Sequence, residues 1–193
     1  MLRAFIVALI GFSGAAFGDA ISDLDEPYPS RTSGSDAVVF GSIGSAYVRS
    51  GDHIPYTDHG ITQMEIGAGY RIPHYQFSAV AGGLDCGGDC ESLTYAGGTI
   101  GLIAEGIGEL PSYLKAFAEF GLYGVRYTDK RSGSCDASGT GVSIAIGGQI
   151  ELSHFYIGAK YRHLATKQIK GFNLDLSKSD VIQSALLTIG FKF

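Results

Sequence analysis

The sequence predicts an all-β protein, an eight-stranded antiparallel transmembrane up-and-down β-barrel. Stretches of about ten residues alternate apolar with small or polar side chains, which is the pattern of a strand with one face on lipid. Eight such stretches follow one another from residue 36 onward, and an even strand number is typical of single-chain bacterial barrels. No stretch in this region has the run of about 20 apolar residues that a membrane helix needs.

The first 35 residues predict export rather than folded structure. Arg3 precedes an apolar run over residues 5–12 and a zone of small residues, as in a secretory signal peptide. We expect the signal to cover residues 1–18, with cleavage as late as residue 20, although an N-terminal membrane anchor is the alternative. Residues 19–35 are rich in Asp, Ser and Pro and predict a polar periplasmic leader, so the barrel is expected over 36–193.

The clearest strand covers residues 61–72. Its apolar-rich face carries Thr62, Met64, Ile66, Ala68, Tyr70 and Ile72, and its other face carries Gln63, Glu65, Gly67, Gly69 and Arg71. The segments 142–152 and 181–193 repeat the pattern, although Gln183 and Leu186 interrupt the alternation of the second. Weaker segments predict the remaining strands at 37–50, 76–85, 92–105, 113–128 and 154–166.

The predicted links between strands alternate in length. Short ones lie at 73–75, 106–112 and 152–153, and longer, more polar ones at 51–60, 86–90, 128–140 and 167–179. Because short links of outer-membrane barrels face the periplasm and long ones the exterior, both chain ends are expected in the periplasm.

The inward faces predict a narrow lumen filled by side chains. Gly, Ser and Ala dominate these faces, whereas a secreted β-sandwich, the alternative, would cover its polar face with charges. Scattered charges of opposite sign should pair inside. They are Glu65, Arg71, Lys115, Glu119, Glu151, Lys160 and Arg162, with Gln149 and Lys192 nearby.

Aromatic residues are expected to form girdles where hydrocarbon meets lipid headgroups. The predicted periplasmic girdle contains Tyr70, Phe77, Phe155, Phe191 and Phe193, and the exterior girdle Tyr47, Tyr127 and Tyr161.

Several motifs together resemble the small OmpA-type and opacity-type outer-membrane barrel family. They are the signal, the Gly-rich strands, residues 67–71 before the Pro73-His74 turn, Tyr161-Arg162, and the ending 186–193. The ending resembles the β-signal that the outer-membrane assembly machinery recognises, with Phe191 and Phe193 as its aromatic residues. The resemblance implies a location in the bacterial outer membrane, but it does not name a function.

Three cysteines lie beyond the signal, in a compartment where disulfides persist. Cys86 and Cys90 bracket Gly87-Gly88-Asp89 and can form a tight disulfide, or Cys135 can pair with one of them. The sequence leaves both pairings open.

Little in the sequence predicts an enzyme, a metal site or a cofactor. No histidine is followed two residues later by the serine of the lipid A deacylase barrels, and the acidic composition argues against nucleic acid. Ser153 and His154 are expected to be residues of a periplasmic turn that do not pair as nucleophile and base, because neighbours on a strand point to opposite faces. The group Asp52, His53, Asp58 and His59 matches no specific metal site and is expected to be a solvated loop.

We therefore expect a non-enzymatic outer-membrane barrel with a structural role, whose exterior loops serve surface interaction or adhesion. The expected partners are outer-membrane lipid, lipopolysaccharide, the assembly machinery and a surface ligand. A small porin-like channel is the first alternative, and a lipid A-modifying hydrolase using His154 or His163 is the second.

Overall fold

The computed structural model describes residues 35–50, 61–85, 92–104, 111, 113–128, 135–170 and 173–193. For 49–50, 135–137, 168–170 and 173–179 it describes the backbone only. The expected signal and almost all of the expected leader therefore lie outside the described residues. So do Cys86, Cys90 and the acidic and histidine residues of the 51–60 link.

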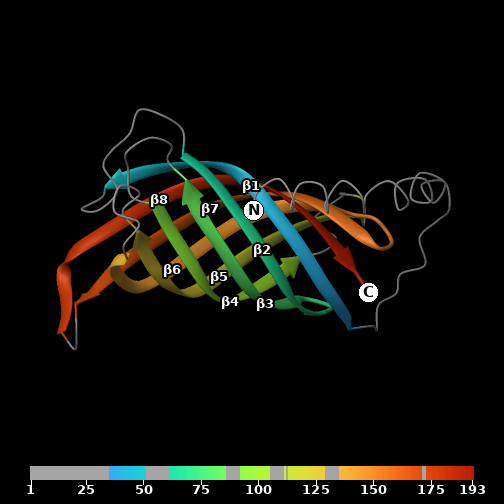
Figure 1. Cartoon of the computed structure of the whole chain (residues 1–193). Helices are drawn as coiled ribbons and strands as arrows, with labels where there is room; N and C mark the ends of the chain where they lie inside the picture. The colour runs from blue at the N-terminus through green and yellow to red at the C-terminus, as the bar shows by residue number, and fades with distance from the viewer. Residues whose placement is uncertain are drawn as a thin grey trace. The chain divides into compact units, whose positions relative to one another are not determined.

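Eight strands close into one antiparallel barrel in which each strand pairs with its neighbours in the chain and β1 pairs with β8 (Figure 1). The bounds are β1 Asp36–Ser50, β2 Ile61–Ile72, β3 Tyr75–Asp85, β4 Ser92–Ala104, β5 Leu114–Thr128, β6 Cys135–Glu151, β7 Phe155–Lys170 and β8 Asn173–Lys192. The predicted fold class is confirmed, and no helix among the described residues is long and apolar enough to cross a membrane.

The predicted bounds of two links are wrong, because both links are shorter than expected. β6 already begins at Cys135, and β7 and β8 remain paired as far as Lys170 and Asn173, so that most of 128–140 and 167–179 is strand. The reason is that backbone hydrogen bonds continue a ladder without any apolar side chain. The apolar period therefore marks only the part of a strand that meets lipid, and about 9–11 residues suffice for that.

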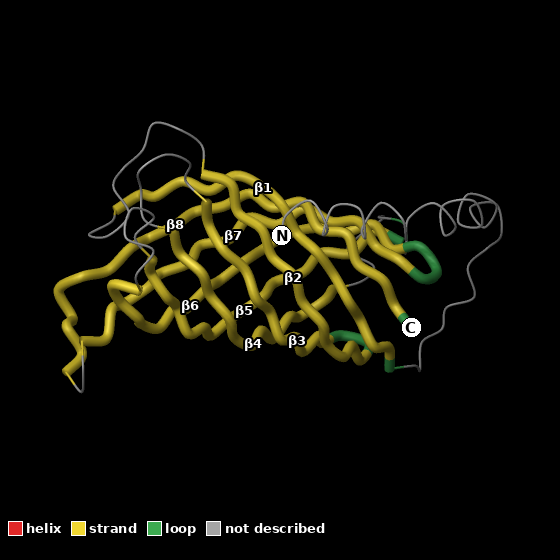
Figure 2. Tube along the Cα trace, viewed as in Figure 1, coloured by secondary structure: helices red, strands yellow, loops and turns green. Residues whose placement is uncertain are grey.

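The barrel has two ends that differ in their connections (Figure 2). The turn end holds the first residue of β1, the turns at 73–74 and 152–154, the end of β4, the start of β5 and the end of β8. The loop end holds the other strand ends, including the β7–β8 hairpin.

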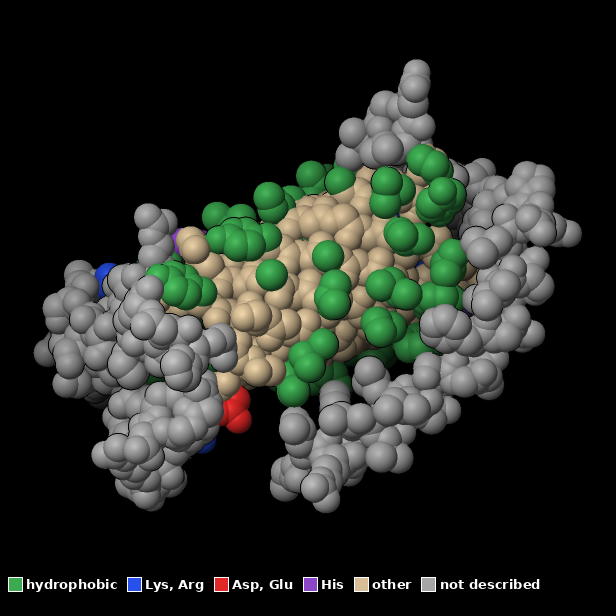
Figure 3. All heavy atoms as spheres, turned by 90° about the horizontal axis from the view of Figure 1, so that it is seen from above, with side chains coloured by type: hydrophobic (Ala, Val, Ile, Leu, Met, Phe, Trp, Pro, Cys, Tyr) green, Lys and Arg blue, Asp and Glu red, His purple; other side chains and the backbone are tan. Residues whose placement is uncertain are grey.

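The outer wall is apolar. Exposed and buried residues alternate along the strands, as in β2 and β4. The most exposed aliphatic side chains of the middle are Ile144 at 60%, Ile146 at 61% and Leu187 at 63%. Figure 3 shows hydrophobic side chains spread over the wall, with charged ones visible only toward the left of the view. Such a wall is unfavourable in water and suits the hydrocarbon of a bilayer.

The predicted aromatic girdles are correct only in part. Tyr70, Phe77 and Phe193 are exposed at the turn end, and Tyr47 is exposed toward the loop end. Tyr161 is exposed as well, but it pairs with Ile146 in the middle of the wall, so its placement in the exterior girdle is wrong. The prediction that Tyr127 belongs to the exterior girdle is wrong, because this residue is 1% exposed and follows Tyr123 and Val125 on the inward row of β5. Phe155, at the first position of β7, is also buried.

Candidate functional site: the barrel lumen

All seven charged residues named from the sequence lie on inward rows. Five of them, Glu65, Arg71, Glu151, Lys160 and Arg162, are buried, and Lys115 and Glu119 are partly buried. They come from β2, β5, β6 and β7, and they divide into a central cluster and a cluster at the turn end.

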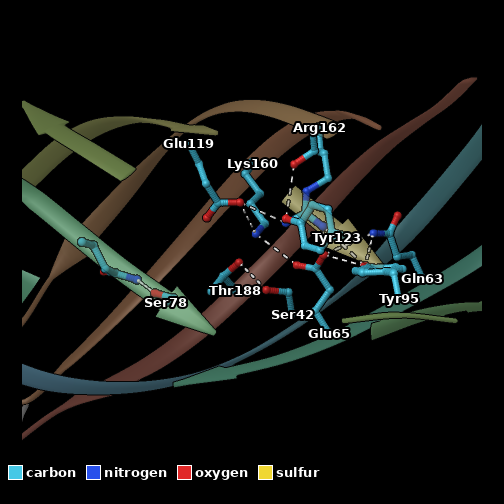
Figure 4. Close-up of polar contacts among 12 residues, drawn as sticks. Ser42, Gln63, Glu65, Ser78, Tyr95, Glu119, Tyr123, Lys160, Arg162 and Thr188 are labelled. Atoms are coloured by element: carbon cyan, nitrogen blue, oxygen red, sulfur yellow. Dashed lines mark hydrogen bonds and ion pairs between the residues drawn. The ribbon is translucent and has the colours of Figure 1, made fainter. Parts of the chain in front are cut away.

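The central cluster pairs two carboxylates with two cations. Arg162 of β7 is ion-paired with Glu65 of β2, and both side chains are fully buried. The Arg162 Nη2 atom lies 3.0 Å from the Glu119 carboxylate of β5. Lys160 lies 3.0 Å from Glu65 and 3.5 Å from Glu119 (Figure 4). The formal charges therefore cancel, which a group of buried ions requires.

Neighbouring polar side chains hold the Glu65 carboxylate in place. The Tyr95 hydroxyl of β4 donates a 2.6 Å hydrogen bond to it, and that hydroxyl accepts one of 2.6 Å from the Gln63 amide. The ring of Tyr123 lies 5.8 Å from the Arg162 guanidinium and packs edge-on against Tyr95. Side chains from β2, β4, β5 and β7 thus meet in this layer, and Ser143 of β6 donates a 3.2 Å hydrogen bond to the Tyr123 hydroxyl.

The packing of Phe40 beside the central cluster depends on a glycine. A side chain at Gly67 would collide with the ring of Phe40, which fills the lumen beside it. The Lys160 ammonium lies 5.9 Å from the centre of the same ring. Gly67 therefore leaves the space that the Phe40 ring occupies next to the central cluster.

A second cluster lies at the turn end and gathers around Glu151. Arg71 is ion-paired with it, Lys115 lies 2.7 Å away, and Lys192 lies 3.4 Å away. Gln149 donates a 2.6 Å hydrogen bond to the same carboxylate. These contacts tie β2, β5, β6 and β8 together at this end of the lumen.

A small cavity separates the two clusters. Its volume is about 30 Å³, and Phe40, Gln76, Thr99, Gln149 and Lys160 are among the residues that line it. This is room for about one or two water molecules with polar neighbours to hold them.

Toward the loop end the lumen becomes apolar, which the sequence pattern does not predict. Beyond the apolar layer, the Tyr127 hydroxyl donates a 2.7 Å hydrogen bond to Asp180 and lies 2.5 Å from the Thr166 hydroxyl. The inward apolar side chains of this layer are Ala46, Val48, Ile61, Leu84, Leu93, Val125, Leu164 and Ile182. Only the strand parity identifies them, because apolar residues on both faces hide the period of two.

Side chains therefore fill the described lumen at each level. Along β2 the inward residues from turn end to loop end include Arg71, Glu65 and Ile61. They belong in turn to the turn-end cluster, the central cluster and the apolar layer. An eight-stranded barrel has an interior of about this capacity. Ion pairs of this kind fix the relative positions of strands that are not neighbours.

The other candidates from the sequence form no site in the described residues. No group of His, Cys, Asp and Glu there can hold a metal ion. The side chain of Cys135 is outside the description, like Cys86 and Cys90, so both disulfide pairings stay predictions.

Ser153 and His154 lie in a turn as predicted, but the expectation that their side chains do not pair is wrong. The Ser153 Oγ and His154 Nδ1 atoms form a 3.0 Å hydrogen bond, because the two residues lie in a bend and not in a strand. Both side chains are on the surface of the turn end. His163 faces outward, away from the lumen.

Comparison with known proteins shows similarity in fold only. No protein-family model matches the chain, and no curated protein matches it. Among solved structures, neisserial surface protein A is similar with a TM-score of 0.66 at 16% identity, covering 83% of this chain and 99% of that one. The attachment invasion locus protein Ail of Yersinia pestis has a TM-score of 0.50 at 16% identity, with the same coverage. The chain thus has the fold of the small eight-stranded outer-membrane β-barrels.

Proposed function

We propose that the chain is a non-enzymatic integral protein of the bacterial outer membrane that makes its functional contacts at the loop end. The filled lumen carries this proposal, because ion pairs and apolar side chains occupy the space that a pore or a substrate would need. An exposed apolar wall supports the membrane location. The turn end, with its short turns at 73–74 and 152–154, then faces the periplasm.

The loop end offers more backbone for recognition than the turn end. The links at 51–60, 86–91 and 129–134 join strands there, and β7 and β8 continue as a paired hairpin. In β-barrels, binding residues belong mainly to loops that a rigid scaffold positions. The similar protein Ail is an attachment invasion protein by its name, and neisserial surface protein A is a surface protein by its name. The name of Ail favours adhesion, and the name of neisserial surface protein A favours a place at the cell surface.

Loop replacement tests this proposal. Cells that express the full chain are compared with cells in which residues 51–60 are replaced by a Gly-Ser segment of equal length. A matched control replaces Pro73-His74 at the turn end with Asn-Gly. Adhesion to epithelial monolayers and to immobilised extracellular glycoproteins should fall with the first change only.

An epitope tag inserted in 51–60 supplies the second readout. It should be detected by antibody on intact cells, whereas a tag at 73–74 should need permeabilised cells. Equal adhesion of all three strains, or a tag at 51–60 that intact cells hide, would refute the proposal.

The C-terminal strand is the proposed contact for the outer-membrane assembly machinery. Phe193 is the most exposed large hydrophobic residue described, and its backbone amide donates a 3.0 Å hydrogen bond to the Ala37 carbonyl. Phe193→Ala should lower the amount of barrel inserted in cells but leave refolding in detergent unchanged. Equal insertion of the variant would remove this contact from the account.

A further inference from the structure

The outer wall carries very few charges. Among the Asp, Glu, Lys and Arg side chains that the structure describes, three face outward: Asp85 on β3, Arg126 on β5 and Lys167 on β7. All three belong to the loop end. The two cations lie on β5 and β7, on either side of β6, and Asp85 lies two strands from β5.

The register shows an abrupt change in chemistry on this part of the wall. Leu122, Val142 and Ala165 form one outward row across β5, β6 and β7, and all three are exposed. One step nearer the loop end, about 7 Å along a strand, the row contains Thr140 and Lys167. The row after that contains Arg126.

Hydroxyl groups surround the two cations. Arg126 pairs with Ser138 on β6 and with Thr94 on β4, and Thr140 pairs with Lys167. The side chains of Ser138, Thr140 and Thr94 are all exposed on the outside. A guanidinium binds two phosphate oxygens at once, an ammonium adds a point charge, and hydroxyls donate further hydrogen bonds.

We propose that Arg126 and Lys167, with the hydroxyls of Ser138 and Thr140 between them, bind a phosphate of lipid A in the outer leaflet. This site rests on the proposed function, since it requires the loop end to face outward. The apolar row below it would contact the acyl chains of the same lipid. Lipid A suits the site better than a phospholipid because its phosphate monoesters carry up to two negative charges each, whereas the phosphodiester of a phospholipid carries one.

Binding to purified lipids tests the site. The barrel, refolded in detergent, is titrated with bisphosphorylated lipid A and separately with phosphatidylglycerol, and bound lipid is counted by native mass spectrometry. Arg126→Gln and Lys167→Gln should each weaken lipid A binding about fivefold, the effect of one cation near an anionic headgroup. Arg31→Gln, which removes an equal charge before the barrel, is the matched control and should change nothing.

The outcomes separate the alternatives. Unchanged affinity in both barrel variants, or an equal loss in Arg31→Gln, would overturn the site. The assignment to lipid A would be overturned if phosphatidylglycerol bound as tightly as lipid A and if its binding fell by the same factor in Arg126→Gln and Lys167→Gln. Unboiled gel mobility shows that each variant is folded. If the replacement of 51–60 leaves adhesion unchanged while Arg126→Gln still weakens lipid A binding, the adhesion part of the proposed function is wrong, whereas the outer-membrane orientation and the lipid site stand.

Discussion

Arg162 on β7 and Glu65 on β2 form a buried ion pair across the lumen, between strands that are separated by β8 and β1 on one side of the barrel. Their side chains have no exposed surface. The pair therefore connects opposite parts of the wall, and its polar neighbours hold it in one geometry.

Removing one member of the central cluster should destabilise the barrel strongly. Glu65→Gln leaves Glu119 alone with two cations, and an unbalanced buried charge costs about 3–5 kcal/mol. The double variant Glu65→Gln with Arg162→Gln restores the balance and should recover most of this loss. Urea unfolding of the barrel in lipid vesicles measures both free energies.

Thr62→Ala, on the outward row of the same strand, is the control and should change the free energy of unfolding by less than about 0.5 kcal/mol. If the double variant were as unstable as the sum of its two single variants, the ion pair would not be the cause.

A side chain added at Gly67 should be harmful where one at Gly98 is not. At Gly67 a methyl group meets the Phe40 ring, and overpacking of this kind costs about 1–3 kcal/mol. At Gly98 the nearest atom is the Ser78 carbonyl oxygen at 3.9 Å, an ordinary contact. The midpoints of thermal unfolding of Gly67→Ala and Gly98→Ala should therefore differ, and equal midpoints would contradict the packing described here.

The cost of a charge on the outer wall should depend on its height along β6. Ile144→Arg lies in the middle of the apolar wall and should cost about 2–4 kcal/mol, whereas Thr140→Arg lies nearer the loop end and should cost about 0–1 kcal/mol. Refolding yields and urea titrations in vesicles measure this difference. Equal costs at both positions would argue that this wall is not in hydrocarbon.

The wild-type barrel should show no steady ion conductance in planar bilayers. Both charged layers and the apolar layer fill its lumen, and the cavity between the charged layers is about 30 Å³. A reproducible conductance that changes in Glu65→Gln or Arg162→Gln would instead establish the channel function.

Much of this fold could be predicted from the sequence, because a strand with one face toward lipid and the other toward the lumen has a hydrophobic period of two. The bounds of β2 were predicted to the residue, and Glu65 and Arg71 were placed on the inward face. Period and parity are local properties, so no knowledge of the partner strands was needed.

The pairing inside the lumen could not be predicted in the same way. Glu65 and Arg162 belong to strands that are not neighbours, so their contact depends on the closure and register of the whole barrel. Tyr127 shows a second limit. An aromatic residue near a strand end is typical of a girdle. Tyr127 nevertheless faces inward, because residues two apart on a strand share a face and Val125 is buried.

The most direct test of the central claim, that this chain forms a closed barrel in a membrane, is gel mobility with and without boiling. The mature chain is refolded in detergent or vesicles, and circular dichroism records its strand content. A closed barrel predicts strong β signal and a band that shifts on boiling. A chain that is soluble without detergent and runs identically before and after boiling would contradict the account.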